Sequence, residues 1–147
     1  MIRFGFQVDV ARPPEEVFAY VTDPRKLPEW QGTHEIVQLT EGRLGKGTRL
    51  REVRTVLGRQ LESITEVAEY ERDRRFGVRI LSGPAPIEDR WAFEPTDGGT
   101  RVHFSAEGRA AGVLRAVEPL LAVVLRRRRQ GHHARLKQAL ERRRDQS

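Results

Sequence analysis

The chain of 147 residues contains no cysteine, no asparagine and a single methionine, Met1. Without cysteine, the sequence excludes disulfide bonds, thiolate metal sites and a cysteine nucleophile. Without asparagine, it has no acceptor site for N-glycosylation. The sequence therefore excludes the classes of protein that depend on cysteine chemistry.

Long hydrophobic runs are missing as well. The most apolar helical stretch, Val113 to Leu125, has only 13 residues and contains Arg115, Glu118 and Pro119. It is too short and too charged to span a bilayer. The N-terminus also lacks the apolar segment of a signal peptide. The sequence therefore predicts a soluble, cytoplasmic protein with one domain over residues 1–147, a size that suits a single hydrophobic core.

Positive charge is concentrated in the last quarter of the chain, although the net charge of the whole is only +6. From Arg109 to Ser147 there are 11 basic and three acidic residues, whereas the first 108 residues carry 16 basic and 18 acidic ones. The run Arg126–Arg129 fits an acidic partner or an anionic membrane surface. Nucleic acid is disfavoured because no aromatic residue interleaves with these arginines to stack on bases. The alternative is a solvated helix surface, with Arg128 or Arg129 packing its stem over the apolar seam.

The first 30 residues predict a strand followed by two short helices. Apolar and polar residues alternate from Ile2 to Val10, which is the period of a half-buried strand. Pro13-Pro14-Glu15-Glu16 has the composition of a first helical turn, because proline needs no N–H there and acids favour the positive end of the helix dipole. Asp23-Pro24 repeats this arrangement and starts a second helix that runs to about Trp30.

Six further strands are expected before Gly108. They are His34–Leu39, Thr48–Leu57, Gln60–Tyr70, Arg75–Leu81, Ile87–Glu94 and Thr100–Gly108. Gly58-Arg59 predicts a tight hairpin turn, which places Glu52 opposite Thr65 and Arg54 opposite Ser63. The face that carries these residues has less charge than the other, so we predict that it is the inner face.

From about Val113 the apolar residues follow a helical period. The predicted apolar face consists of Val113, Val117, Leu120, Leu121, Val124, Leu125, Leu136, Ala139 and Leu140. A helix of ~30 residues is ~45 Å long, which is enough to cross a whole sheet. Pro119 is expected to kink this helix or to separate a short first piece from it.

Neither a metal nor a cofactor is predicted. The four histidines lack the spacing of metal ligands. The glycine-rich segment Glu41–Gly47 superficially resembles a phosphate loop, but its glycine spacing differs and a strand rather than a helix follows.

Six segments of the chain occur in a recognisable order. They are Val8-Asp-Val-Ala-Arg-Pro-Pro-Glu-Glu-Val-Phe18, Asp23-Pro-Arg-Lys-Leu-Pro-Glu-Trp30, Gly45-Lys-Gly47, Trp91-Ala-Phe-Glu-Pro95, Gly98-Gly-Thr100-Arg-Val102 and Leu136-Lys-Gln-Ala-Leu-Glu141. This order resembles the START-like (SRPBCC, helix-grip) superfamily, and within it the polyketide cyclase/dehydrase-like branch. The resemblance implies an α+β helix-grip fold: a curved antiparallel sheet of about seven strands, two short helices after the first strand, and a long C-terminal helix over the concave face.

For function, the resemblance implies an apolar cavity between the sheet and the last helix, holding a lipid, a polyketide or another small hydrophobic molecule. It does not imply a reaction, since one fold hosts many functions. Aromatase/cyclase members of the superfamily place a basic residue on the strand aligned with Gln60–Tyr70, where this chain has Val67. This difference argues against the aromatase/cyclase members as the nearest group. Cyclases with an Asp–His pair stay compatible, because Asp89 could approach His132 or His34.

The residues predicted to contact the ligand are Trp30, His34, Glu52, Arg54, Ser63, Thr65, Asp89, Trp91, Phe104 and His132. Each of these residues also fits a structural role that involves no ligand. The tryptophans also fit a packed core, and the three charged residues also fit a local ion-pair network. His132 fits either a general base or a histidine at the cavity rim without a catalytic role. His133 and His103 are expected to point outward.

Three functions are compatible with the sequence. The first is a noncatalytic carrier or sensor of a small hydrophobic molecule. The second is a cofactor-free cyclase or dehydratase that transfers protons through Asp89, Glu52 or a histidine. The third is an interaction module that uses the basic C-terminal helix. The ligand, the pathway and the oligomeric state do not follow from the sequence, and neither does the presence of catalysis.

Overall fold

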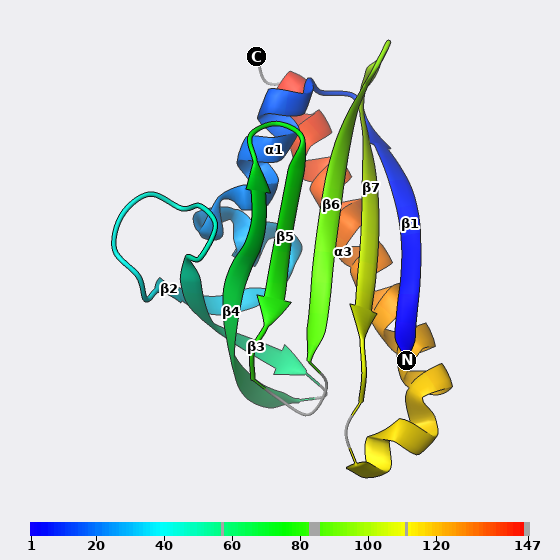
Figure 1. The fold of residues 1–147 in the computed structure, drawn as a ribbon. Coiled ribbons are helices and arrows are strands. Elements are labelled where there is room, and N and C mark those ends of the chain that lie inside the picture. The colour runs from blue at the N-terminus through cyan, green and yellow to red at the C-terminus, as the bar shows by residue number, and fades with distance from the viewer. Residues whose placement is uncertain (57, 83–85, 111, 146–147) are drawn as a thin grey trace.

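In the computed structural model, which describes residues 1–56, 58–82, 86–110 and 112–145, the strands form one antiparallel sheet. The strands are β1 (Ile2–Val10), β2 (Thr33–Gln38), β3 (Arg49–Val56), β4 (Arg59–Glu71), β5 (Arg75–Ile80), β6 (Ile87–Thr96) and β7 (Gly99–Gly108). Their order in the sheet is β1-β7-β6-β5-β4-β3-β2, so the first strand lies beside the last one (Figure 1).

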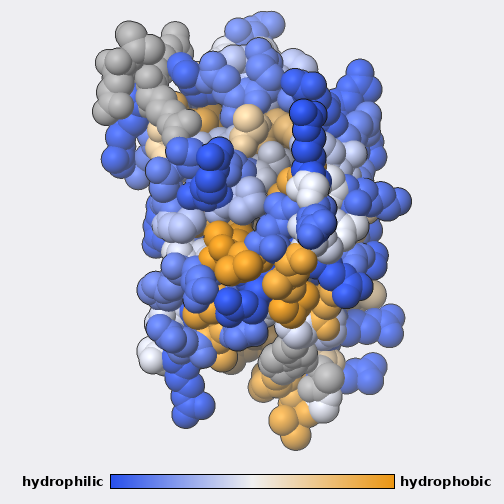
Figure 2. Space-filling view, turned by 90° about the vertical axis from the view of Figure 1, so that its left-hand side faces the viewer, coloured by the Kyte–Doolittle hydropathy of each residue, from blue (hydrophilic) through white to orange (hydrophobic). Residues whose placement is uncertain are grey.

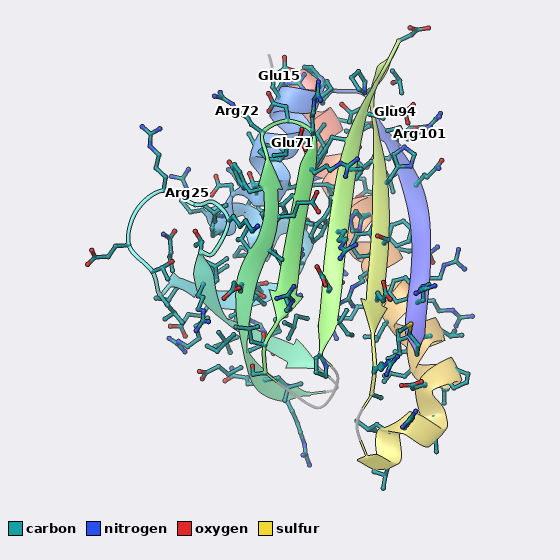
Figure 3. The ribbon with its side chains drawn as sticks, viewed as in Figure 1. Glu15, Arg25, Glu71, Arg72, Glu94 and Arg101 are labelled. Carbon is teal, nitrogen blue, oxygen red and sulfur yellow. The ribbon has the colours of Figure 1, made fainter. Side chains whose placement is uncertain are left out.

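The helices cover one face of this sheet. The elements α1 (Pro14–Thr22), η1 (Pro24–Lys26) and α2 (Leu27–Trp30) follow β1, and η2 (Gly112–Val117) leads into α3 (Glu118–Asp145). Helix α3 crosses behind the strands in the view of Figure 1. The opposite face carries charged side chains, among them Glu94 and Arg101 on the neighbouring strands β6 and β7 (Figure 3). This is the predicted α+β helix-grip fold.

Local sequence explains how the segment after β1 folds. Pro14 lies in the first turn of α1, followed by Glu15, and the side chain of Asp23 accepts a hydrogen bond of 3.0 Å from the backbone N–H of Arg25. That contact caps η1, as the predicted Asp-Pro start requires. No helix in the described part of the chain combines the length and the hydropathy needed to cross a membrane.

Two glutamates attach the ends of α3 to the ends of β1. Glu118 lies 2.6 Å from the amino group of Met1 and accepts a hydrogen bond of 2.8 Å from the backbone N–H of Ala110. The Met1 amino group therefore lowers the pKa of Glu118. At the other end, Glu141 accepts a hydrogen bond of 3.0 Å from the N–H of Ala11. These contacts fix the helix along the edge strand.

The core lies between the sheet and the helices. Side chains buried there include Val17, Phe18 and Val21 of α1, Trp91, Phe93, Val102 and Phe104 of the sheet, and Leu136 and Leu140 of α3. Each such burial stabilises the fold by roughly 1.5–3 kcal/mol. The second half of α3 is therefore held by hydrophobic packing, whereas its first half is less covered.

The start of the C-terminal helix differs in detail from the prediction. As expected from Pro119, a separate short piece, η2, comes first and α3 begins only at Glu118. Part of the predicted apolar face is open to solvent: Val113 is 89% exposed and Leu120 is 66% exposed. Neither residue belongs to the hydrophobic core.

The β3–β4 hairpin has a different register from the predicted one. Glu52 pairs with Ser63 rather than with Thr65, a shift of two residues. Arg59 begins β4, so it belongs to the strand and not to the predicted Gly58-Arg59 turn. Because side chains alternate with a period of two, this shift leaves every residue on its predicted face.

Candidate functional site

A cavity of about 280 Å³ lies between the concave face of the sheet, α3 and the segment that contains α1 and α2. Its apolar lining comes from Val21, Pro24, Leu27, Leu44, Leu50, Leu61, Phe76, Val78, Ile80, Ile87, Trp91, Leu121 and Leu125. The side of the molecule drawn in Figure 2 has hydrophobic side chains exposed in its middle, surrounded by hydrophilic ones.

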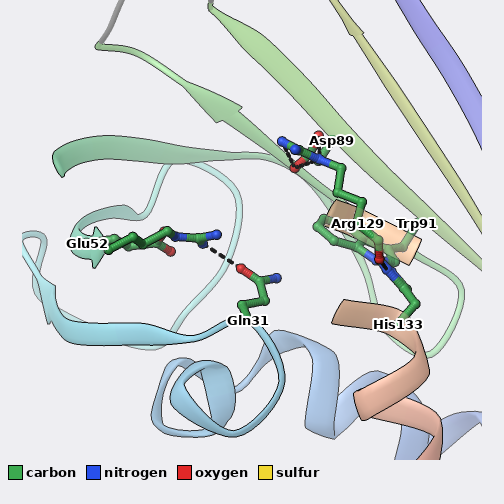
Figure 4. Close-up of polar contacts among 7 residues, drawn as sticks. Gln31, Glu52, Asp89, Trp91, Arg129 and His133 are labelled. Carbon is green, nitrogen blue, oxygen red and sulfur yellow. Dashed lines mark hydrogen bonds and ion pairs between the residues drawn. The ribbon is translucent and has the colours of Figure 1, made fainter. Parts of the chain in front are cut away.

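An ion pair on β3 forms one polar part of the cavity wall. Glu52 is 5% exposed and lies 2.6 Å from the guanidinium of Arg54, which also donates a hydrogen bond to the amide oxygen of Gln31 (Figure 4). A carboxylate removed from water needs such a partner, because burying an unpaired charge is costly. Arg54 therefore links the sheet to the end of α2.

A second ion pair connects the sheet to α3. Arg129 donates from Nη2 to Asp89 over 3.1 Å and from Nε over 3.2 Å, and both side chains are 12% exposed (Figure 4). Two N–H groups of Arg129 that donate to one carboxylate fix the relative orientation of the two side chains, in addition to neutralising the charge of Asp89. The single Glu52–Arg54–Asp89 network considered from the sequence is thus replaced by two separate pairs.

His132 faces the cavity from α3, as predicted. The residue is 8% exposed, and its imidazole has no hydrogen-bond partner among the described residues. Burial, followed by the positive charges of Arg54, Arg128 and Arg129, lowers the pKa of His132 to about 3. The ring is therefore neutral near pH 7. The Asp–His pair considered above does not form, because Asp89 is paired with Arg129 instead.

Arg128 also lines the cavity, next to His132. Its side chain is half-buried and has no carboxylate partner among the described residues. Burial and the nearby charges of Arg54, Arg129 and Arg135 lower its pKa. The sequence predicted that Arg128 or Arg129 would lean over the apolar seam, and the structure places both of them there.

His133 was expected to point outward, and this expectation is wrong. The residue is 1% exposed, accepts the indole N–H of Trp91 at Nε2 over 2.9 Å, and has Nδ1 2.7 Å from the carbonyl oxygen of Arg129 (Figure 4). The ring lies 4.8 Å from that of Phe104 and 5.1 Å from that of Phe6. The concave sheet curves around this part of α3. The buried face of the helix is therefore wider than one stripe of residues, and it includes His133 as well as His132.

The other predicted residues lie in different surroundings. Ser63, Thr65 and Trp91 line the cavity, and Phe104 lies in an adjoining pocket of about 20 Å³.

Besides Phe104, two further predicted residues are not among those that line the cavity. Trp30 is fully buried and packs against His133, with ring centroids 5.4 Å apart. His34 is exposed on β2, where it contacts the hydroxyl of Thr55. The strand alternation turns His34 to the outer face, whereas Trp30 belongs to the core.

Gln31, Arg128 and Arg129 are cavity residues that were not among the predicted ligand contacts. Leu121, Leu125, Arg128, Arg129 and His132 follow the helical spacing of one stripe, which places both arginines beside the predicted His132. The helical spacing in the sequence could therefore have identified both arginines as cavity residues. Among the described residues, no three His, Asp or Glu side chains form a group that could hold a metal ion.

The sheet, the gripped helix and the cavity define the class of protein: an α+β helix-grip fold that encloses a mostly apolar space. Residues 1–141 match the sequence model of the family described as polyketide cyclase / dehydrase and lipid transport. The chain belongs to this family. The predicted superfamily and branch are thereby confirmed.

Solved structures of low sequence identity share the fold. The di-domain ARO/CYC BexL from the BE-7585A biosynthetic pathway is 18% identical, with a TM-score of 0.81 over 96% of this chain and 47% of BexL. SA2116 from Staphylococcus aureus, a protein of unknown function, is 14% identical, with a TM-score of 0.78 over 98% of this chain and 96% of SA2116. Ara h 8.0201 is 16% identical, with a TM-score of 0.73 over 94% of this chain and 96% of that protein.

At these identities the likeness concerns the fold alone. The chain spans about half the length of BexL, so the activity of that larger protein is not carried over. No curated protein sequence matches the chain significantly. Family membership supports a role in hydrophobic ligand binding or cyclisation.

Proposed function

We propose that this protein binds and carries a small hydrophobic molecule in the cavity between the sheet and α3. The observation that carries this proposal is the cavity itself, which has a volume of about 280 Å³ and a wall that is mostly apolar. This volume is just below the usual range of small-molecule sites, roughly 300–1000 Å³, so it suits a small ligand. The family description, which includes lipid transport, supports the same conclusion.

Polar groups at one end of this space would orient the ligand. Ser63 and Thr65 line the cavity with hydroxyl groups that both donate and accept hydrogen bonds. Arg54 and His132 add further donors to the cavity wall. A molecule with an apolar body and a few oxygen atoms at one end fits this distribution of groups.

A cofactor-free cyclase is the second candidate, and the family description favours it. The cavity residues give it less support. Glu52 and Asp89 are each held by an arginine. With a pKa of about 3, His132 is a weak base at neutral pH, whereas efficient general bases have pKa values near the working pH. We therefore place binding and carriage ahead of catalysis.

Filling the cavity tests the proposal. Val78 lines the cavity from β5, whereas its neighbour Arg79 points to the outer face. We expect Val78→Trp to weaken binding of the uncharged dye N-phenylnaphthylamine by at least about tenfold, because the new indole occupies the ligand's space, and Arg79→Trp to leave it unchanged. Dye titration followed by fluorescence measures both.

Leu125→Trp approaches the same space from α3 and serves if Val78→Trp does not fold, as judged by circular dichroism. Native mass spectrometry of the wild-type protein should in addition detect copurified apolar molecules. Equal dye affinity in the wild-type protein and in folded cavity-filling variants would overturn the proposal.

A further inference from the structure

The charged groups that line the cavity do not balance. The carboxylates are Glu52 and Asp89, and the guanidinium groups are those of Arg54, Arg128 and Arg129. Each carboxylate has its own arginine: Glu52 lies 2.6 Å from Arg54, and Asp89 lies 3.1 Å from Arg129 (Figure 4). Among the described residues, Arg128 is therefore left as a cavity cation without a counter-ion.

The surroundings of Arg128 make this surplus costly. The side chain is half-buried, and the charges that act on it come from Arg54, Arg129 and Arg135, all of the same sign. A partly desolvated cation among other cations is unfavourable unless an anion joins it. Such an anion would be attracted chiefly by Arg128, because Arg54 and Arg129 are already paired with Glu52 and Asp89.

A second group beside Arg128 is also unsatisfied. His132 follows it by four residues on the same face of α3, lines the same cavity and has no hydrogen-bond partner among the described residues. In its neutral form the ring carries one N–H donor. Arg128 and His132 thus present a charged and an uncharged donor to one region, and both could donate to one oxyanion.

Another part of the cavity wall is apolar. Phe76, Val78 and Ile80 of β5 face Leu121 and Leu125 of α3 across it. These groups suit a hydrocarbon body. An occupant that satisfies both regions needs an apolar chain or ring and an anionic end.

We propose that the ligand is an amphipathic anion, with an apolar body against β5 and α3 and a carboxylate-like head group bound by Arg128 and His132. This inference rests on the proposed binding function and adds the charge of the ligand. The ion pairs Glu52–Arg54 and Asp89–Arg129 stay intact in the complex and keep the surrounding wall neutral.

Two matched alkyl compounds test the inference. Decanoate and decanol share the same chain length and differ in the charge of the head group. By isothermal titration calorimetry at pH 7.5, we expect decanoate to bind about tenfold more tightly than decanol or better, since hydrogen bonds to charged groups are worth more than neutral ones. Arg128→Gln should abolish this preference by weakening decanoate binding while leaving decanol binding unchanged.

Arg127→Gln is the matched control. Arg127 is exposed on the same helix, and its replacement removes the same charge from the protein as Arg128→Gln does. It should preserve the preference for decanoate. Equal binding of decanoate and decanol overturns the anionic head group, and a preference that survives in Arg128→Gln overturns its binding by Arg128. Either result leaves the binding function in place. Failure of both compounds to bind, together with failure of the uncharged dye, overturns both.

Discussion

His133 is a histidine whose ionisation is fixed by its neighbours. Its Nε2 accepts the Trp91 indole N–H, so the neutral ring carries its proton on Nδ1, next to the carbonyl oxygen of Arg129. A second proton on Nε2 would break the contact with Trp91. Burial also lowers the pKa of His133 from 6.5 to about 4.

This pKa predicts how stability depends on pH. Between pH 6.5 and about 4, the unfolded chain binds a proton at His133 and the native protein does not. Acidification through this interval therefore lowers the free energy of unfolding, by up to about 3 kcal/mol, and the loss stops growing below the native pKa. His133→Gln keeps an acceptor for Trp91 and cannot titrate, so its stability should depend less on pH.

Urea unfolding at several pH values from 4 to 7.5 measures this difference. His103→Gln is the control, because His103 lies beside Glu94 on the outer face, with its side chain 37% exposed. At each pH, the free energy of unfolding of each variant is subtracted from that of the wild-type protein. This difference removes the contribution of the carboxylates, which both proteins share. A His133→Gln variant with the same pH slope as the wild-type protein would contradict the prediction.

At the scale of elements, the β6–β7 turn must fit closely against the end of β1. A Cβ atom on Gly99 would lie 2.1 Å from the carbonyl oxygen of Val10 and 2.8 Å from the backbone nitrogen of Arg12, and the φ of Gly99 is +152°. The neighbouring Gly98 has open space around its Cβ position. Adjacent glycines in one turn therefore have different roles.

We expect Gly99→Ala to lower the free energy of unfolding by about 3 kcal/mol or more, because backbone atoms cannot yield as a flexible side chain would. Gly98→Ala should change it by less than about 1 kcal/mol. Chemical denaturation of both variants measures the contrast. Similar losses for the two substitutions would show that the turn adjusts, and that the close approach to β1 is not required.

At the scale of the whole molecule, the basic run Arg126–Arg129 is divided between two surroundings. Arg128 and Arg129 line the cavity, whereas Arg126 and Arg127 are exposed. The exposed apolar residues Val113, Val117, Leu120, Val123 and Val124 lie on η2 and the first turns of α3. Basic and apolar side chains together on one helical segment fit the surface of an anionic membrane better than that of a nucleic acid.

We therefore predict that the protein sediments with vesicles that contain phosphatidylglycerol and not with vesicles of phosphatidylcholine alone, and that added salt weakens the binding. Replacing Arg126 and Arg127 together by glutamine should weaken it by about tenfold or more, since each basic residue near such a surface is worth about 1 kcal/mol. Replacing Arg142, farther along the same helix, removes one positive charge away from the apolar residues and is the control. Absence of binding by the wild-type protein would favour the alternative of a solvated helix surface.

Much of the architecture follows from local sequence. The alternation of Ile2–Val10, the proline-led turns at Pro14 and Pro24, and the helical period after Val113 each depend on a few neighbouring residues, so the elements lie within a few residues of their predicted bounds. The inner face of β3 and β4 was also predicted correctly. Alternation fixes which side chains share a face, even where the register is wrong by two.

What the sequence by itself determined about this protein is the kind and order of its elements, and the cavity-facing positions of Glu52, Asp89 and His132, because the periods of strands and helices are local properties. Only the tertiary structure decided that His133 is buried, that Asp89 pairs with Arg129, and that Arg128 has no counter-ion within the described part of the chain. Those outcomes depend on how far the curved sheet wraps around α3 and on which side chains from distant parts of the chain meet there.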